Sequence, residues 1–369
     1  MTDIFTGWQL AGAAAALLSF GLSVLLVLSK HWHGHHTMDS TFGVQKLHDL
    51  PTPRIGGLAI ACGVLLGYVL APPGVAAQLG PLLLAAIPAL VFGLLEDITK
   101  RVGVRARLLA TMACSVLGWA IAGHAITDVN VPGLDWLLGF TLVSVAFTAM
   151  AVGGLANAFN IIDGINGLAG GTALIVLGGL ALMAWQLGDA DLMALSLILG
   201  GAVLGFGLVN WPFGKLFLGD GGAYFVGFAI AWLAVLLLER HPQVSAWAPL
   251  LACGYPVLEV GFTMLRRKRR HLDLGQPDRL HLHSLVKRRL VHAWLPGSSR
   301  MVRNSAAGAV MWLASLLPVA IALTWPTSTP HLVLGWLLCA LLYSAVYARI
   351  TQFRWCFSAA TLQPKPAKA

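Results

Sequence analysis

The segment "NAFNIIDGINGLAGG" at 157–171 lies between two apolar runs and carries four amide or carboxyl side chains at intervals of three residues. These side chains are Asn157, Asn160, Asp163 and Asn166. If the segment is helical, this spacing places them near one stripe, although Gly164 and Gly167 indicate a break. Oxygen atoms on such a stripe can ligate a hard cation such as Mg²⁺, or bind a nucleobase and a sugar. Polar capping of a helix end is the simpler alternative.

Two adjacent carboxylates, Glu96 and Asp97, end an earlier apolar run in "GLLEDITKR" at 93–101. Lys100 and Arg101 follow them closely. This combination suits a metal–diphosphate site, or one acid could serve as a general base. The alternative is a solvated helix end.

Asp220 opens a further apolar run in "FLGDGGAYFVG". Its carboxylate could ligate a metal ion or cap the start of a helix. The two roles are compatible, because a helix N-terminus also favours phosphate.

Histidines occur in two clusters of different character. His281 and His283 stand in "DRLHLHSLVKRR", beside Arg279 and Lys287, which favours binding of a diphosphate or a nucleotide. A chance pattern in a loop is the alternative. The tract "HWHGHH" at 31–36 has the composition of a metal-binding tract, but histidine-rich stretches beside a membrane are often incidental.

The composition excludes a soluble protein. Of the 369 residues, 57% are hydrophobic and only 11% are charged, against roughly 25% charged in an average soluble domain. So few charges cannot cover a soluble surface, which indicates an integral membrane protein. The net charge of +9 would suggest nucleic acid only on a soluble module, and none is recognisable. We therefore expect no nucleic-acid partner.

Eleven apolar runs are long enough to cross a bilayer, which needs about 20 residues. They lie near 8–29, 55–75, 79–95, 107–123, 136–156, 166–186, 191–209, 221–238, 246–265, 306–325 and 331–349. The chain begins MTDIF, with an acid where a signal peptide carries basic residues, so the first run is interpreted as a retained helix. The prediction is an all-α polytopic membrane protein.

The basic residues predict its orientation, because lysine and arginine concentrate on the cytoplasmic face. With the N-terminus outside, every one of the 24 lysines and arginines except Arg240 falls on the cytoplasmic side. The expected cytoplasmic loops are about 30–54, 96–106, 157–165, 210–220 and 266–305. We expect a single transmembrane domain over 1–349 and a cytoplasmic tail over 350–369. The candidate residues named above then share the cytoplasmic face. The stretch "RRKRRH" at 266–271 is a topological signal that contacts anionic lipid, or alternatively a substrate-phosphate contact.

Six motifs in this order resemble a known family. They are "KLHDLPTPRIGG" at 46–57, "GLLEDITKR" at 93–101, "NAFNIIDGINGL" at 157–168, "FLGDGG" at 217–222, "PVLEVGFTMLRR" at 256–267 and "HLH" at 281–283. The sequence resembles the polyprenyl-phosphate N-acetylhexosamine-1-phosphate transferases, glycosyltransferase family 4 of the WecA and MraY type, and is closer to the WecA-like branch. It departs from the family pattern at Glu96, Asn166 and Glu259, where aspartates are usual. These departures bear on sugar or nucleobase specificity.

The resemblance implies transfer of a sugar 1-phosphate from a UDP-N-acetyl sugar to undecaprenyl phosphate in a bacterial inner membrane, with release of UMP. Two polyanions must meet, so a cation and basic side chains are needed. The implied cofactor is Mg²⁺, with Mn²⁺ as an alternative, and a homodimer is left open. The roles expected are metal binding by Asp220 with Asn160, catalysis by Asp97, Asp163 and Glu96, lipid-phosphate binding by Lys46 and Arg54, and UDP-sugar binding by Asn157, Asn166, Arg279, His281 and His283.

Three rival functions require sequence features of their own. A transporter or flippase of lipid-linked sugars should bury paired charges at mid-membrane and show inverted repeats, and neither is evident. A CDP-alcohol phosphotransferase needs an aspartate-rich motif that "DGINGL" lacks. A phospho-MurNAc-pentapeptide transferase remains as the alternative within the family.

Overall fold

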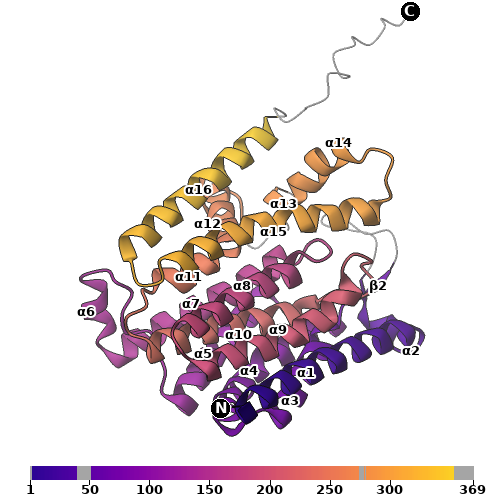
Figure 1. The fold of residues 1–369 in the computed structure, drawn as a ribbon. Coiled ribbons are helices and arrows are strands. Elements are labelled where there is room, and N and C mark those ends of the chain that lie inside the picture. The colour runs from indigo at the N-terminus through magenta and orange to yellow at the C-terminus, as the bar shows by residue number, and fades with distance from the viewer. Residues whose placement is uncertain (1, 40–50, 274–277, 279, 353–369) are drawn as a thin grey trace, which may run out of the picture.

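The computed structural model describes residues 2–39, 51–273, 278 and 280–352, and within these it is almost entirely helical (Figure 1). The helices are α1 (Thr2–Leu28), α2 (Lys30–Thr37), α3 (Gly56–Leu70), α4 (Pro73–Thr99), α5 (Val104–Ala122), α6 (Leu134–Leu138), α7 (Thr141–Ile162), α8 (Leu168–Gln186), α9 (Ala190–Asn210), α10 (Gly219–Arg240), α11 (Trp247–Ala252), α12 (Gly254–Arg269), α13 (Leu282–Leu285), a π-helical turn η1 (Val286–Val291), α14 (His292–Trp294), α15 (Arg300–Thr324) and α16 (Thr329–Thr351). The prediction of an all-α polytopic membrane protein is therefore confirmed at this level.

Nine helices in the described ranges are long and apolar enough to cross a membrane. They are α1, α4, α5, α7, α8, α9, α10, α15 and α16. The other two predicted runs are also helical but differ from a simple span. The run at 55–75 forms α3, which has only 15 residues and ends before Pro72 and Pro73. The run at 246–265 is divided at Cys253 into α11 and α12. The count of eleven and the predicted orientation remain predictions.

The division at Cys253 has a backbone cause. Pro256 has no N–H to donate to the carbonyl of residue 252, and its ring would clash with that carbonyl in a continuous helix. A hydropathy window does not register this, because every residue around the break is apolar or small.

Two short strands depart from the all-α prediction. Residues Met38–Asp39 form β1 and Thr52–Pro53 form β2, paired antiparallel. Thr52 precedes a proline, which disfavours helical backbone and favours an extended conformation. The extended chain continues beside residues 217–218, where Phe217 N–H donates to Pro53 carbonyl at 2.8 Å. This pairing brings the segment just before α3 to the start of α10.

Helix α10 occupies the centre of the bundle and is buried along nearly its whole length. It packs against α3, α4, α7 and α8, as expected for a helix that is apolar on every face. Its first turn fits between α3 and α4 through glycines. A Cβ atom at Gly57 would lie 2.2 Å from Gly222 N, and one at Gly93 would lie 2.5 Å from Gly221 N. Asp220 is thereby held where α3, α4 and α10 approach one another closely.

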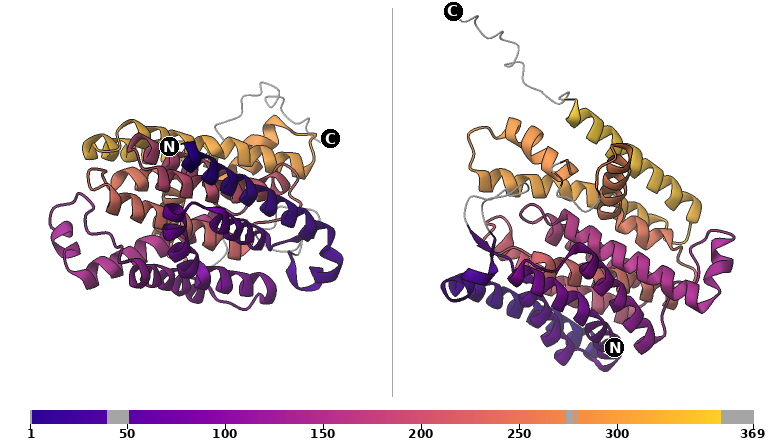
Figure 2. Two further views of the ribbon diagram at one scale, coloured as in Figure 1. Left: turned by 60° about the horizontal axis from the view of Figure 1, so that its bottom comes forward. Right: turned by 180° about the vertical axis from the view of Figure 1, so that it is seen from behind.

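The two ends of the bundle carry different connections. Helices α2 and α14 and strand β2 lie at one end, while α6 and the start of α1 lie at the other (Figure 1). The views from below and behind show the same arrangement (Figure 2). The segments that the charge distribution placed together on one face thus include α2, β2 and α14 at a common end of the molecule.

Candidate active site

Asp220 is the centre of a polar cluster in the first turn of α10. It is 5% exposed. Its Oδ1 accepts hydrogen bonds from Asn160 Nδ2 of α7 and from Arg54 Nη2, both at 3.0 Å, and its Oδ2 pairs with Arg107 Nη1 of α5. Asp220 and Asn160, which were predicted together as metal ligands, are therefore in direct contact.

Asp97 lies directly behind this cluster and is fully buried. Its Oδ1 accepts the backbone N–H of Asp220, and its Oδ2 that of Gly221, each at 2.9 Å. Arg54 Nη2 is 3.6 Å from Asp97 Oδ1. Because the first N–H groups of a helix have no partner within it, Asp97 of α4 caps α10 and fixes the position of Asp220.

The neighbouring acid, Glu96, bonds to the turn that follows its own helix. Its Oε2 accepts the backbone N–H of Val102 at 2.8 Å, which closes the turn after α4. Lys100 follows in the left-handed conformation and ends the helix. Glu96 and Asp97 are thus adjacent in sequence but engage different partners.

Asn157 and Asn160 share one face of α7, as their spacing predicts. The hydroxyl of Tyr224 donates to Asn160 Oδ1 at 3.3 Å and to Asn157 Oδ1 at 3.4 Å. The guanidinium of Arg107 lies over the ring of Tyr224, 5.9 Å from its centroid. This arrangement collects amide oxygens and a cation next to Asp220.

The second half of the polar stripe turns away, as its glycines predict. Helix α7 ends at Ile162, and the half-buried Asp163 follows as its C-cap; its negative charge acts on Asp97 electrostatically. Asn166 is 4% exposed and contacts α15 instead. Its Nδ2 donates to Ser305 Oγ at 3.3 Å, and its Oδ1 accepts from Asn304 Nδ2 at 2.9 Å.

The histidine pair lies beside the same turn. The rings of His281 and His283 stack at 5.4 Å between centroids. A Cβ atom at Gly164 would lie 2.8 Å from His283 Nε2, so the pair reaches the 157–168 segment. Burial lowers the pKa of His283 to about 4, and this ring is neutral at pH 7. Lys46 and Arg279, also predicted as binding residues, lie outside the described residues.

Two residues of the cluster are absent from the sequence prediction, Arg107 and Tyr224. The available signal for Arg107 is a cation at the start of an apolar run, on the face where the acids gather. Tyr224 carries no comparable signal, because a tyrosine in an apolar run is ordinary. Both are identified only once α5, α7 and α10 are packed together.

The oxygen atoms of the cluster suit a hard cation. Asp220 offers a carboxylate, and Asn157 and Asn160 offer amide oxygens; within the described ranges no group of three or more histidine, cysteine, aspartate or glutamate side chains is placed to hold a metal. Mg²⁺ commonly takes one or two protein carboxylates and completes its shell with water and substrate phosphates. The donors present therefore fit Mg²⁺ better than a metal that needs several protein ligands.

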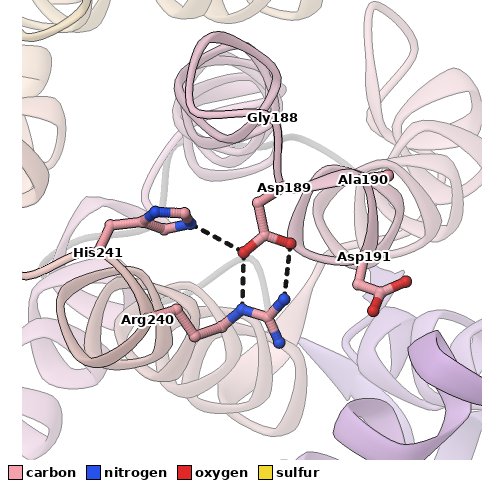
Figure 3. Close-up of a pocket in the computed structure, with 6 residues that line it drawn as sticks. All are labelled: Gly188, Asp189, Ala190, Asp191, Arg240 and His241. Carbon is pink, nitrogen blue, oxygen red and sulfur yellow. Dashed lines mark hydrogen bonds and ion pairs between the residues drawn. The ribbon is translucent and has the colours of Figure 1, made fainter.

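A second ionic cluster lies at the other end of α10 (Figure 3). Asp189 accepts from Arg240 Nε at 2.6 Å and Nη2 at 2.9 Å, and His241 Nε2 is 2.9 Å away. Burial alone would raise the pKa of Asp189, but hydrogen bonds from Arg240, from the Leu192 backbone N–H and from His241 outweigh it and lower this pKa. These residues, with Gly188 and Asp191, line an open hollow of about 500 Å³.

The class of the protein follows from comparison with known families. Residues 79–238 match the family described as Glycosyl transferase family 4. The matched segment contains Asp97, the four polar side chains between Asn157 and Asn166, and Asp220. The resemblance predicted from the motifs is confirmed, and so is the class of enzyme, a phosphoglycosyltransferase.

Individual relatives are named as transferases of one type of reaction. The probable undecaprenyl-phosphate N-acetylglucosaminyl 1-phosphate transferase of Bacillus subtilis (strain 168) is 29% identical over 240 residues, which are 65% of this chain and 66% of the relative. The undecaprenyl-phosphate alpha-N-acetylglucosaminyl 1-phosphate transferase of Yersinia pestis is 27% identical over 252 residues, 66% and 68% of the two chains. The phospho-N-acetylmuramoyl-pentapeptide-transferase of Geobacillus kaustophilus (strain HTA426) is 34% identical over 199 residues, 50% and 61%. The similarity thus spans about two thirds of the first two relatives.

Proposed function

We propose that this protein transfers an N-acetylhexosamine 1-phosphate from a UDP-sugar to undecaprenyl phosphate and releases UMP, in a bacterial inner membrane with the site facing the cytoplasm. This would be the first membrane step of a cell-envelope glycan such as an O-antigen or a common antigen. The observation that carries the proposal is the cluster around Asp220, where Asn160, Arg54 and Arg107 from three other segments meet the first turn of α10.

The reaction joins two phosphates. An oxygen of the acceptor phosphate attacks the sugar-linked phosphorus of the UDP-sugar, a new P–O–P bond forms, and the bond to UMP breaks. Catalysis of such a transfer is mainly positioning and charge compensation. Arg54, Arg107 and the N-terminus of α10 supply positive charge at one place. Bound Mg²⁺, held by Asp220 with Asn160, would neutralise and orient the phosphates.

The carboxylates divide the remaining work. Both oxygens of Asp97 are used by the start of α10, which supports a role in orienting Asp220. Asp163, half-buried beside the cluster, is the better placed of the two to position or deprotonate the acceptor phosphate. Asn166 would act on the UDP-sugar by holding the turn after α7 against α15. Asn157 would contact the UDP-sugar from the face of α7 that it shares with Asn160.

An apolar cavity supports the lipid acceptor. It has a volume of about 530 Å³ and lies among α6, α7, α10, α11 and α12, with residues of the segment before α6 also in its wall. Its walls include Met150, Leu155, Val235 and Trp247, and it reaches Val260 and Gly261 of α12. These two residues directly follow Glu259, which contacts His281. A polyprenyl chain in this cavity would hold its phosphate near the polar cluster.

A second candidate donor is UDP-MurNAc-pentapeptide. The relative with the highest identity among the three acts, by name, on a phospho-N-acetylmuramoyl-pentapeptide. A transferase for that donor would share the acceptor and the phosphate chemistry, and would differ in the sugar that it accepts.

The deciding experiment measures UMP release by purified protein with undecaprenyl phosphate and Mg²⁺ or Mn²⁺. The donor panel contains UDP-GlcNAc, other UDP-N-acetylhexosamines and UDP-MurNAc-pentapeptide. We expect release with one UDP-N-acetylhexosamine, its loss with EDTA and its recovery with added Mg²⁺. Release only with the pentapeptide donor would favour the second candidate. No release with any donor, in protein that remains folded, would refute the transferase proposal.

A further inference from the structure

Glu259 is a fully buried carboxylate in α12. It contacts Thr263 of its own helix and the segment 280–285, here called the histidine segment because it carries His281 and His283. Its Oε1 lies 3.0 Å from Nδ1 of His281. The backbone N–H of Leu282 donates to both Glu259 oxygens, at 3.3 and 3.2 Å. An ionised carboxylate can only accept hydrogen bonds, so the ring nitrogen facing it carries the proton.

The same face of α12 holds the histidine segment at a second point. Glu259 and Arg266 are seven residues apart and lie on one side of the helix. Arg266 donates to the carbonyl of Leu280 at 3.0 Å and pairs with Asp278. Arg266 therefore fastens the backbone of this segment without contacting the ring of His281, which makes it a comparator for Glu259.

The proton on Nδ1 determines what His281 presents on its other side. With Nδ1–H directed at Glu259, Nε2 is the ring nitrogen that remains for a ligand. Such carboxylate–histidine pairs fix the orientation and tautomer of the ring. The stacked neighbour, His283, is neutral and reaches Gly164, so it lies between the ring of His281 and the 157–168 segment at this point.

We propose that Glu259 is a positioning residue of the transferase: it holds His281 with Nδ1–H toward the carboxylate, so that Nε2 faces the diphosphate of the UDP-sugar. The role in transfer rests on the function proposed above. Glu259 acts only through His281.

The test is a double-mutant cycle on UMP release. Glu259→Gln keeps the shape and an oxygen that can accept from Leu282 N–H, but it loses the charge that selects the tautomer. We expect kcat/KM for the UDP-sugar to fall about 10- to 100-fold, as for other residues that orient a histidine. In a His281→Ala background the same change should cost less than about 2-fold, because residues that act as one unit are not additive.

Arg266→Gln supplies the matched control. It weakens the backbone attachment of the segment, and its cost should be the same whether or not His281 is present. If Glu259→Gln also costs the same factor in both backgrounds, or costs nothing in the wild-type background, Glu259 does not act through His281 and the proposal is overturned.

A spectroscopic measurement decides the pairing without relying on activity. In protein with ¹⁵N-labelled histidine, His281 is identified by comparison with His281→Ala. Its Nδ1 should carry a directly bonded proton in the wild type and lose that state in Glu259→Gln. An Nδ1 that is unprotonated in the wild type would overturn the proposal. Wild-type protein that releases no UMP with any donor would refute the transferase function, while this measurement would still decide the contact between Glu259 and His281.

Discussion

A buried aspartate paired with arginine lies at each end of α10, Asp220 in its first turn and Asp189, from the start of α9, beside its last turn. The two pairings differ in where the partners come from. Asp189, beside the last turn of α10, takes both Nε and Nη2 of Arg240. Asp220, in the first turn, takes one bond from Arg54, one contact from Arg107 and one bond from Asn160. The first arrangement is a two-point clamp by one side chain, and the second is a convergence of groups from separate elements.

The difference separates a structural pairing from a binding site. At the Asp189 end both carboxylate oxygens face a single guanidinium fork, with His241 beside them (Figure 3). The backbone N–H of Leu192 also donates to this carboxylate. This is the geometry of a strong, fixed ion pair. At the Asp220 end the arginines arrive from the segment before α3 and from α5, and amide oxygens lie alongside. Side chains that come from different helices can reorient toward a ligand while every helix stays folded.

The largest effect should come from removing the carboxylate at the convergent end. Asp220→Asn should reduce UMP release by about 10³-fold or more, because an amide cannot replace a carboxylate that faces a cation and phosphates. Melting temperature in detergent and membrane insertion should stay near the wild type. Near-normal release at ordinary Mg²⁺ would remove Asp220 from the site and end the contrast between the two aspartates.

The sequence and the structure agree on this centre for a physical reason. Asn157 and Asn160 are one turn apart on an unbroken helix, so their spacing alone places them on one face. Asp220, at the start of an apolar run, was predicted as a metal ligand or a helix cap; its side chain does not cap α10, and its role as a ligand stays a prediction. The capping of α10 by Asp97, by contrast, joins residues more than 120 positions apart, and no local pattern carries that information.

The turn at 163–167 shows where the prediction became incomplete. The glycines indicated a break, and Gly167 does adopt a left-handed conformation with φ of 75°. The direction taken by Asn166 after the break depends on the packing of α15, which its own neighbours do not determine. In the same way, apolar runs located the helices, while the division at Cys253 depended on the backbone chemistry of one proline.

The next largest effect is expected at Arg107. Its substitution tests whether an arginine beside Asp220 contacts a substrate phosphate or only forms a structural ion pair, as Arg240 does with Asp189. Arg107→Ala should lower kcat/KM by about 10²-fold, as the loss of one charged phosphate contact does. Arg107→Lys keeps the charge but not the planar fork, and should recover only part of the activity. Steady-state UMP release checks both variants. Full activity in Arg107→Ala would mean that its contact with Asp220 is structural, like that of Arg240 with Asp189.

Substitution of Asn166 tests how far the site around Asp220 extends toward α15. Asn166→Ala removes two hydrogen bonds to α15 and should chiefly raise KM for the UDP-sugar or change the sugar preference, with little change in dependence on undecaprenyl phosphate. Asn304→Ala removes one of the same bonds from the α15 side and is the matched control. A rise in KM with both variants would assign Asn166 to positioning of the turn, and a rise with Asn166→Ala alone would support direct contact with the donor. A fall in kcat with KM unmoved would contradict the expectation.

The smallest effect on activity is expected at the clamped end. Asp189→Asn should leave UMP release per folded molecule within about 2-fold, yet lower stability by about 1.5–3 kcal/mol, the usual contribution of hydrogen bonds to charged groups. The pH dependence follows from the lowered pKa of Asp189. In the folded protein the pKa of this carboxyl lies below its ordinary value of 3.8. Its contribution to stability is therefore complete above about pH 4 and is lost as the pH falls further. The difference in melting temperature between wild type and variant should therefore be constant from about pH 5 to 8 and narrow below pH 4. A loss of activity that matches Asp220→Asn would show that the two ends of α10 are coupled, and that the clamp serves the reaction.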